Sequence, residues 1–255
     1  MDLKGKSALV TGGSGAIGKA ICEELLKNGI KNLGLIDLQP GESTVNDWKS
    51  RFPSVFITFY RADVTLQEDL ELCFKKFTEE IQNLDIVVNC AGILNESEFK
   101  KVIEVNLIAV IRSTLLAIDC MRVDSKCGKG GVVLNIVSDA GFKIFRATPS
   151  YGASKHGLLA YTRSVALEGK DLGMRFISLC PAQTKSELYD GIFSPGRHFM
   201  PSKWNIEEEK ASNVAQEPAE VGKAAAEVIR SGENGSVWVV KQGKLSEVTI
   251  PAVEF

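Results

Sequence analysis

Short apolar runs alternate with longer amphipathic stretches along the whole chain, and this order restricts the possible folds more than any other feature. The runs are nearly continuous in Val, Ile, Leu and Phe, which is typical of strands buried on both faces of a parallel sheet. Seven such runs occur, at 7–10, 33–38, 55–60, 85–89, 131–137, 176–180 and 237–240. Repeated strand–helix units with right-handed crossovers build a doubly wound sheet. We therefore predict a single α/β domain over residues 1–255, with about seven parallel strands and helices on both faces.

Composition excludes several classes of protein. The chain has 30 basic and 32 acidic side chains, so it lacks the basic surplus of a nucleic-acid-binding domain. It has no apolar run of about 18 residues that could span a membrane, and residues 1–10 lack the apolar core of a signal peptide. The six cysteines form no CxxC pair, and we interpret them as reduced core residues. We expect a cytoplasmic protein with no nucleic-acid partner, no membrane span and no metal site.

Residues 185–216 interrupt the regular order. This segment mixes polar and aromatic residues and shows no clear period. A long irregular segment in a compact domain is usually a functional lid or a disordered loop. The aromatic side chains in the segment favour a loop that covers a substrate.

A glycine-rich turn connects the first apolar run to the first amphipathic stretch. It contains Gly13-x-Gly15-x-x-Gly18 and, overlapping it from Thr11, the pattern Thr-Gly-x-x-x-Ala-x-Gly. Glycines allow backbone N–H groups to approach a diphosphate, and the start of the following helix adds a partial positive charge. The position between a strand and a helix is the context that a dinucleotide-binding motif requires. We predict a Rossmann-type site whose cofactor-binding residues here are Gly12, Ser14, Gly15, Ala16, Ile17 and Gly18.

Asp37 ends the second apolar run, 19 residues after Gly18. A carboxylate at this position accepts hydrogen bonds from the adenosine ribose and repels a 2′-phosphate. Residues 38–44 contain no Arg or Lys that could bind such a phosphate, so we predict NAD as the cofactor. The alternative is that Asp37 only begins a turn before Pro40-Gly41, and the glycines upstream argue against it.

Tyr151 and Lys155 lie four positions apart, just after a Pro-Ser pair that favours the start of a helix. Residues i and i+4 share one helical face, so the phenol and the ammonium can point toward one ligand. Oxidation of an alcohol needs a base, and a nearby cation shifts the tyrosine pKa from about 10 toward working pH. Ser138 follows the predicted strand 132–137, and ligands of open α/β sheets bind beyond the carboxyl ends of strands. We predict that Ser138 holds the substrate oxygen while Tyr151 exchanges its proton.

The chain resembles the short-chain dehydrogenase/reductases over nearly its whole length. The matching motifs are Thr11-Gly12-x-x-x-Ala16-x-Gly18, Asp63-Val64, Asn89-Cys90-Ala91-Gly92, Asn106, Ser138, Tyr151 and Lys155. The resemblance implies that Tyr151 is the general acid/base and that Lys155 lowers its pKa and binds the nicotinamide ribose. It also implies that Ser138 orients the substrate oxygen and that Asn106 holds the water of a proton relay.

The same resemblance implies further cofactor contacts. Asp63 and Val64 would flank the adenine, Asn89 and Ala91 would lie along the cofactor, and Thr184 would be available to the nicotinamide amide. The sequence departs from the usual family pattern at three places. These are Ala16 in place of Gly, Cys90 in place of Asn, and Pro181-Ala182-Gln183-Thr184 in place of Pro-Gly. None of these departures removes a catalytic group.

Within the family, the chain is similar to the insect-type alcohol dehydrogenases and the 15-hydroxyprostaglandin dehydrogenase-like enzymes. The cues are the short stretch 91–106, Gly130-Gly131-Val132 and the tail 235–238. Bulky side chains near the site predict an apolar pocket, and they are Phe142, Phe145, Tyr189, Phe193, Phe199, Met200 and Trp204. We therefore expect a hydrophobic alcohol or carbonyl substrate of the fatty, isoprenoid, steroid or prostaglandin-like kind. The resemblance also implies a homodimer or homotetramer.

Two alternatives remain open at this point. One is an NADPH-dependent carbonyl reductase. A comparison of how tightly the protein binds NAD and NADP would distinguish it from an NAD-dependent dehydrogenase. The other is a catalytically silent nucleotide-binding sensor or scaffold, against which the joint presence of Asn106, Ser138, Tyr151 and Lys155 argues. Asp139, beside Ser138, could tune the site, but we expect it to solvate its loop.

Overall fold

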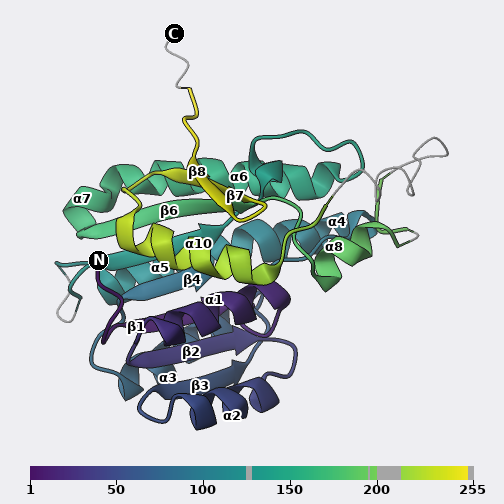
Figure 1. The fold of residues 1–255 in the computed structure, drawn as a ribbon. Helices are drawn as coiled ribbons and strands as arrows, with labels where there is room; N and C mark the ends of the chain where they lie inside the picture. The colour runs from purple at the N-terminus through teal and green to yellow at the C-terminus, as the bar shows by residue number, and fades with distance from the viewer. Residues whose placement is uncertain (125–127, 195, 200–213, 252–255) are drawn as a thin grey trace.

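Eight strands in the described part of the chain form one sheet (Figure 1). The structure is a computed structural model, and it describes residues 1–124, 128–194, 196–199 and 214–251. The strand order is β3-β2-β1-β4-β5-β6-β7-β8, and the first seven strands of this order run parallel. The strands are β1 Ser7–Thr11, β2 Asn32–Asp37, β3 Phe56–Arg61, β4 Ile86–Asn89, β5 Gly131–Ile136, β6 Met174–Pro181, β7 Val237–Lys241 and β8 Lys244–Glu247. The predicted doubly wound α/β fold is confirmed.

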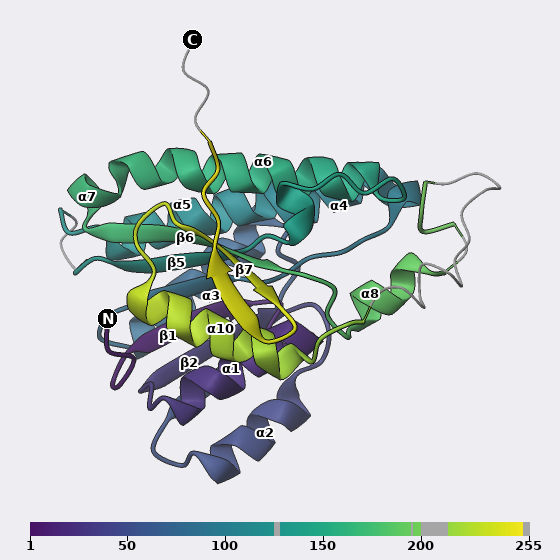
Figure 2. The same ribbon diagram turned by 45° about the horizontal axis from the view of Figure 1, so that its top comes forward.

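Helices cover both faces of this sheet (Figures 1 and 2). The helices on one face are α1 Ala16–Lys27, α2 Glu42–Arg51 and α10 Pro218–Ser231. The helices on the other face are α3 Gln67–Glu80, α5 Ala109–Met121 and α6 Pro149–Val165. Shorter elements are η1 Glu96–Glu98, α4 Phe99–Ile103, the π turn η2 Glu104–Ile108, η3 Asp139–Gly141, η4 Ala166–Glu168, α7 Gly169–Leu172 and α8 Glu187–Ile192. Of the helices described, none is long and apolar enough to cross a membrane.

The central strands are buried on both faces, which explains their continuous apolar runs. Successive side chains of a strand point to opposite faces. In β4, Val88 packs into the core beneath α1 and α10, whereas Val87 packs into the core beneath α3 and α5. β1 pairs with β2 on one side and with β4 on the other. The order in which the chain adds strands to the sheet therefore changes direction between β1 and β4. Such a switch point leaves a crevice at the carboxyl ends of the strands, where ligands of these folds bind.

β8 is the strand that the sequence did not predict. It pairs antiparallel with β7 through a turn at Gln242 and Gly243, whose φ angles are 52° and 70°. Two consecutive positive φ angles are typical of a tight hairpin turn. The sequence of β8 is Lys-Leu-Ser-Glu, and its residues are mostly exposed at the edge of the sheet. A short polar edge strand has no apolar run, so the seven apolar runs correspond to the seven parallel strands and β8 is added to them.

The segment 185–216 begins and ends at neighbouring positions. The N–H of Lys185 donates to the Gln216 carbonyl (3.0 Å), and the N–H of Gln216 donates to the Gln183 carbonyl (2.9 Å). Inside the segment, α8 begins after Ser186, whose hydroxyl accepts a hydrogen bond from the Tyr189 N–H. The six residues of α8 are too few to show a helical period in the sequence, which explains why the segment was expected to be irregular. Met200 and Trp204 lie outside the described residues.

Candidate active site

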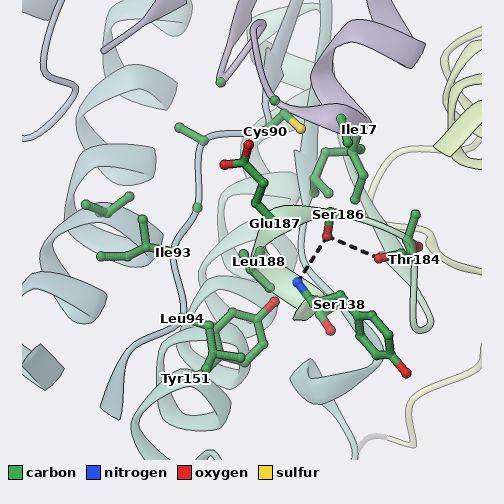
Figure 3. A pocket seen from close by; sticks show the side chains of 18 of the residues that line it. Ile17, Cys90, Ile93, Leu94, Ser138, Tyr151, Thr184, Ser186, Glu187 and Leu188 are labelled. Carbon is green, nitrogen blue, oxygen red and sulfur yellow. Dashed lines mark hydrogen bonds between the residues drawn. The ribbon is translucent and has the colours of Figure 1, made fainter. Parts of the chain in front are cut away.

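A pocket of about 1240 Å³ lies at the carboxyl edge of the sheet, and Figure 3 shows part of its lining. Residues from nearly every predicted motif line it. They are Gly12, Ser14, Gly15, Ala16, Ile17, Gly18, Asp37, Asp63, Val64, Ala91, Ser138, Tyr151, Lys155 and Thr184. Two other predicted site residues, Asn89 and Asn106, do not line this pocket.

The glycine-rich turn is packed too closely to admit side chains at two positions. Gly12 has a φ of +68°, and a Cβ atom there would lie 2.6 Å from the backbone nitrogen of Ala91. A Cβ atom on Gly18 would lie 2.0 Å from the carbonyl oxygen of Gly12. Thr11 holds the turn against the end of β4, because its Oγ1 accepts from the N–H groups of Cys90 (3.2 Å) and Ala91 (3.3 Å). The turn is therefore fixed at the pocket wall by its close backbone packing and by the hydroxyl of Thr11.

The start of α1 has the properties of an anion site. No side chain caps this helix, and its first turn contains no acidic residue. Ala16, Ile17 and Gly18 of the first turn line the pocket. The hydroxyl of Ser14 is buried and has no hydrogen-bond partner among the described residues. Uncapped N–H groups, a positive helix end and an unsatisfied hydroxyl together fit a diphosphate.

Two carboxylates that line the pocket, those of Asp37 and Asp63, are held by hydrogen bonds mainly from backbone N–H groups. Asp37 accepts from the N–H of Ser14 (2.8 Å) through Oδ2 and from the N–H of Gln39 (2.9 Å) through Oδ1. Asp63 accepts from both the N–H (2.9 Å) and the hydroxyl (2.8 Å) of Thr65 through Oδ1. Asp37 is the last residue of β2 and Asp63 follows β3, and these hydrogen bonds fix both carboxylates where they can accept hydrogen bonds from ribose or adenine.

Tyr151 lies in the first turn of α6, and its phenol projects into the pocket (Figure 3). Its side chain is 9% exposed and packs in an apolar cluster with Leu94, Val102 and Ala140. Burial raises the pKa of Tyr151 to about 12, and the charge of Asp139 acts in the same direction. The hydrogen bond with Ser138 lowers this pKa. The phenol is therefore neutral at physiological pH unless another charge stabilises its anion.

Lys155 supplies a cation one helical turn after Tyr151. Its Nζ donates to the carbonyl oxygen of Ile136 (3.0 Å) and lies 5.6 Å from the centre of the Tyr151 ring. The side chain is 4% exposed, and burial lowers the pKa of Lys155 to about 8. The predicted pair is thus brought together in one pocket, with the ammonium fixed beside the phenol.

Ser138 follows β5 in an unusual backbone conformation. Its φ is 152° and its ψ is 160°, a region that non-glycine residues seldom adopt and that often marks functional sites. Its hydroxyl accepts from the N–H of Ala140 (3.2 Å), which fixes the turn into η3. The neighbouring Asp139 is buried and accepts from Lys143 Nζ (3.0 Å). The expectation that Asp139 solvates its loop is wrong, because this ion pair holds the carboxylate inside the protein.

Asn106 lies behind the pocket, in the π turn between α4 and α5. Its amide accepts from the N–H of Ile93 (2.9 Å) and donates to the carbonyl of Ile93 (2.9 Å). It also donates to the hydroxyl of Ser154 (3.1 Å), which in turn donates to the carbonyl of Tyr151 (2.7 Å). π turns inside helices are frequent at functional sites. In this structure the Asn106 side chain positions the loop after β4 and the turn that carries Tyr151.

Asn89 requires a correction, because its side chain points into the core and not along the pocket. Its Nδ2 donates to Oδ1 of Asn135 (2.9 Å), and its Oδ1 accepts from the hydroxyl of Ser113 (2.6 Å). Asn89 is 1% exposed. These hydrogen bonds join β4 to β5 and α5, so Asn89 fixes the sheet beneath the pocket.

The substrate end of the pocket is mainly apolar. Phe145, Tyr189 and Phe193 line it as predicted, and Ile93, Leu94, Leu188 and Ile192 join them. Phe142 and Phe199 do not line it. Phe142 packs instead against the core between α5 and α6, and Phe199 is 66% exposed. The part of the chain that the structure describes contains no group of three or more His, Cys, Asp or Glu residues that could hold a metal ion.

The fold and this pocket together define a nucleotide-dependent oxidoreductase. A family profile described as "short chain dehydrogenase" matches residues 6–195. The chain belongs to the short-chain dehydrogenase family, whose members act on alcohols and carbonyl compounds.

Several known proteins are similar to this chain. Alcohol dehydrogenase 2 of Ceratitis capitata is 28% identical over 251 residues, which cover 98% of this chain and 96% of the relative. The 15-hydroxyprostaglandin dehydrogenase [NAD(+)] of Rattus norvegicus is 36% identical over 196 residues, which cover 75% of this chain and 73% of the relative. The crystal structure of levodione reductase has the same fold, with a TM-score of 0.80, 24% identity and coverage of 94% of this chain and 97% of that one. The resemblance to the insect and prostaglandin branches is confirmed.

Proposed function

We propose that this protein is an NAD-dependent dehydrogenase that interconverts a hydrophobic primary or secondary alcohol and its aldehyde or ketone. One observation carries the proposal: Ser138, Tyr151 and Lys155 line the same pocket as the glycine-rich turn. A base, its activating cation and an anchor for the substrate oxygen thus share one cavity with a phosphate site. We also propose, from the family resemblance, that it works in the cytoplasm as a homodimer or homotetramer.

The residues present fit a nicotinamide dinucleotide. The turn at Gly12, the first residues of α1 and the free hydroxyl of Ser14 would hold the diphosphate. Asp37 would accept from the adenosine ribose, and Asp63 with Val64 would flank the adenine. The bound cofactor supplies the acceptor for the hydride that leaves the alcohol carbon.

The proton is handled by the chain itself. Ser138 holds the substrate oxygen, and Tyr151 accepts the hydroxyl proton as the carbon is oxidised. The ammonium of Lys155 stabilises the phenolate form of Tyr151, which is the base that accepts this proton, and so opposes the burial that raises the pKa of Tyr151. In the reverse direction Tyr151 returns the proton to the carbonyl oxygen, so the same three groups serve oxidation and reduction.

The lining of the substrate end supports an apolar substrate. Phe145, Leu188 and Phe193 line the region next to Tyr151, and polar side chains of the neighbouring segments, such as Glu187 and Arg197, line the pocket as well. The apolar wall is suited to a long or bulky hydrocarbon part of a substrate, which favours such a molecule over a sugar. The relatives' names include an alcohol dehydrogenase and a prostaglandin dehydrogenase, which agrees with this class.

The test of this proposal is turnover of apolar alcohols, followed at the absorbance band of the reduced nicotinamide. Fatty, isoprenoid, steroid and prostaglandin-like alcohols are each offered with NAD and with NADP, and the corresponding carbonyls are offered with the reduced cofactors. We expect reduction of NAD by at least one apolar alcohol and a weaker response to sugars. Turnover with NADP alone would identify a carbonyl reductase instead, and binding without turnover on any substrate would indicate a sensor or scaffold.

Asp37→Ala is expected to reduce the preference for NAD over NADP by about tenfold or more. The Asp37 carboxylate offers acceptors to ribose hydroxyls and repels a 2′-phosphate, and alanine does neither. Lys19 lines the same pocket, and Arg61 donates to the carbonyl of Leu38 near its rim, so cations are available once the carboxylate is removed. The dissociation constants of both cofactors measure the change. An unaltered ratio would remove Asp37 from the ribose site.

A further inference from the structure

Glu96 is a buried carboxylate that none of the sequence motifs includes and that the proposed chemistry does not use. It lies in η1, in the loop after β4, and is 9% exposed. Its Oε2 accepts from the N–H of Ser150 (2.8 Å), and its Oε1 accepts from the N–H of Tyr151 (2.9 Å). Both N–H groups belong to the first turn of α6, and one of them belongs to Tyr151 itself.

The first turn of α6 lacks a local cap. The residue before the helix, Thr148, makes no capping hydrogen bond through its side chain, and Pro149 has no N–H group. The N–H of Gly152 already donates to the carbonyl of Thr148 (2.8 Å). The N–H groups of Ser150 and Tyr151, which lie between Pro149 and Gly152, donate their hydrogen bonds to Glu96. A carboxylate at this place also matches the positive end of the helix dipole, so one distant side chain supplies the whole cap.

The loop that carries Glu96 also contacts the segment that borders the substrate end. The N–H of Glu96 donates to the carbonyl of Arg197 (3.0 Å). Two residues earlier, Leu94 packs against Tyr151 in their shared apolar cluster. Loop 93–98 therefore lies between the acid/base helix and the substrate-lining segment, and the Glu96 carboxylate is its polar attachment to that helix.

We propose that Glu96 is a positioning residue for proton transfer, because its carboxylate fixes the turn of α6 that carries Tyr151. The inference rests on the proposed function, in which Tyr151 is the acid/base. A loosened first turn would let the phenol move within the pocket, and small displacements of a reacting group reduce the rate of the chemical step strongly. Cofactor binding would be nearly unaffected, since Glu96 does not line the pocket.

The first measurement is amide hydrogen exchange, which needs no substrate. The amides of Ser150 and Tyr151 should exchange their hydrogens slowly in the wild-type protein, although first-turn amides ordinarily lack a partner and exchange fast. In Glu96→Gln the side-chain amide keeps one acceptor and presents a donor to the second N–H. We expect exchange in the peptide 148–155 to accelerate about fivefold. Fast exchange in the wild type would overturn the capping role.

The second measurement is the kinetic effect of the same substitution. Glu96→Gln should lower kcat about tenfold, while the dissociation constant of NAD stays within about twofold of the wild-type value. Asp85→Asn is the matched control, because Asp85 accepts from the N–H of Ser7 (2.9 Å) and from Lys6 Nζ (3.0 Å) at the opposite edge of the sheet. It removes a similar carboxylate–amide contact, and we expect it to leave kcat unchanged.

The outcomes separate this inference from the proposed function. An active wild type together with a Glu96→Gln variant of unchanged kcat would overturn the positioning role alone. Equal losses of kcat in Glu96→Gln and Asp85→Asn would also overturn it, because the effect would then be general destabilisation. A wild type that oxidises none of the alcohols refutes the proposed function, whereas the exchange rates still decide whether Glu96 caps α6.

Discussion

Tyr151→Phe is expected to lower kcat for alcohol oxidation about a thousandfold, the middle of the range for loss of a general acid/base. The substitution removes only the hydroxyl, and the ring remains in its apolar cluster with Leu94 and Val102. Folding and the dissociation constant of NAD should therefore stay close to their wild-type values. Steady-state kinetics with saturating cofactor, together with cofactor titration, measure the two effects separately.

The same helix offers a control for this experiment. Tyr161 also lies in α6, and its hydroxyl is buried without a hydrogen-bond partner among the described residues. Tyr161→Phe removes an unsatisfied polar group, so we expect unchanged kcat and a stability that is equal or higher by about 1 kcal/mol. If Tyr151→Phe kept more than about a tenth of the activity, or if both variants lost activity alike, Tyr151 would not be the acid/base.

The sheet could be predicted because the core imposes a continuous pattern on each central strand. In β4, Val87 and Val88 meet different helical layers, so both positions must be apolar. The pocket could be predicted for a related reason. Parallel strands bring their carboxyl ends to one edge, where Asp37 ends β2, the turn at Gly12 follows β1 and Ser138 follows β5. Local order along the chain therefore determined which residues would share the pocket.

Features that depend on side-chain direction or on distant partners were not predicted. Asn89 follows the alternation of β4, which turns its side chain to the face of Val87 and into the core, away from the main pocket. Glu96 caps a helix 55 residues further along the chain, so no local capping pattern announces it. Asp139 is next to a loop in the sequence, yet Lys143 one turn later keeps it buried. These positions depend on tertiary contacts that the one-dimensional pattern does not contain.

Lys155→Met is expected to lower kcat about a hundredfold and to change how stability depends on pH. Burial raises the pKa of Tyr151 to about 12, and without the ammonium the hydrogen bond with Ser138 has to oppose this rise with no cation beside the ring. The phenolate that must accept the alcohol proton is then less populated, and kcat for oxidation falls. Methionine keeps most of the side-chain volume, so the comparison isolates the charge.

The effect of Lys155 on stability follows from its lowered pKa. The folded state holds this pKa at about 8, compared with 10.5 for an ordinary lysine. Below pH 8 the folded protein holds Lys155 as a charged ammonium inside the core. Because burial of a charge is unfavourable, this lowers the free energy of unfolding. Between these two pKa values the unfolded chain binds a proton that the folded protein lacks, so the wild type becomes more stable as the pH rises. Lys155→Met has no such group and lacks this gain.

The difference in unfolding free energy, wild type minus Lys155→Met, should therefore rise by about 2 kcal/mol between about pH 7 and pH 9.5. Urea unfolding of both proteins at several pH values measures it. Loss of the bond from Nζ to the Ile136 carbonyl shifts the difference by a constant amount, because that carbonyl does not titrate. Cys90 and Tyr151 cancel in the subtraction, because burial raises the pKa of each to about 12 and both stay protonated in either folded protein at these pH values. A difference that stays constant with pH would mean that the Lys155 amine keeps an ordinary pKa, and that it is not held as a buried cation beside the phenol.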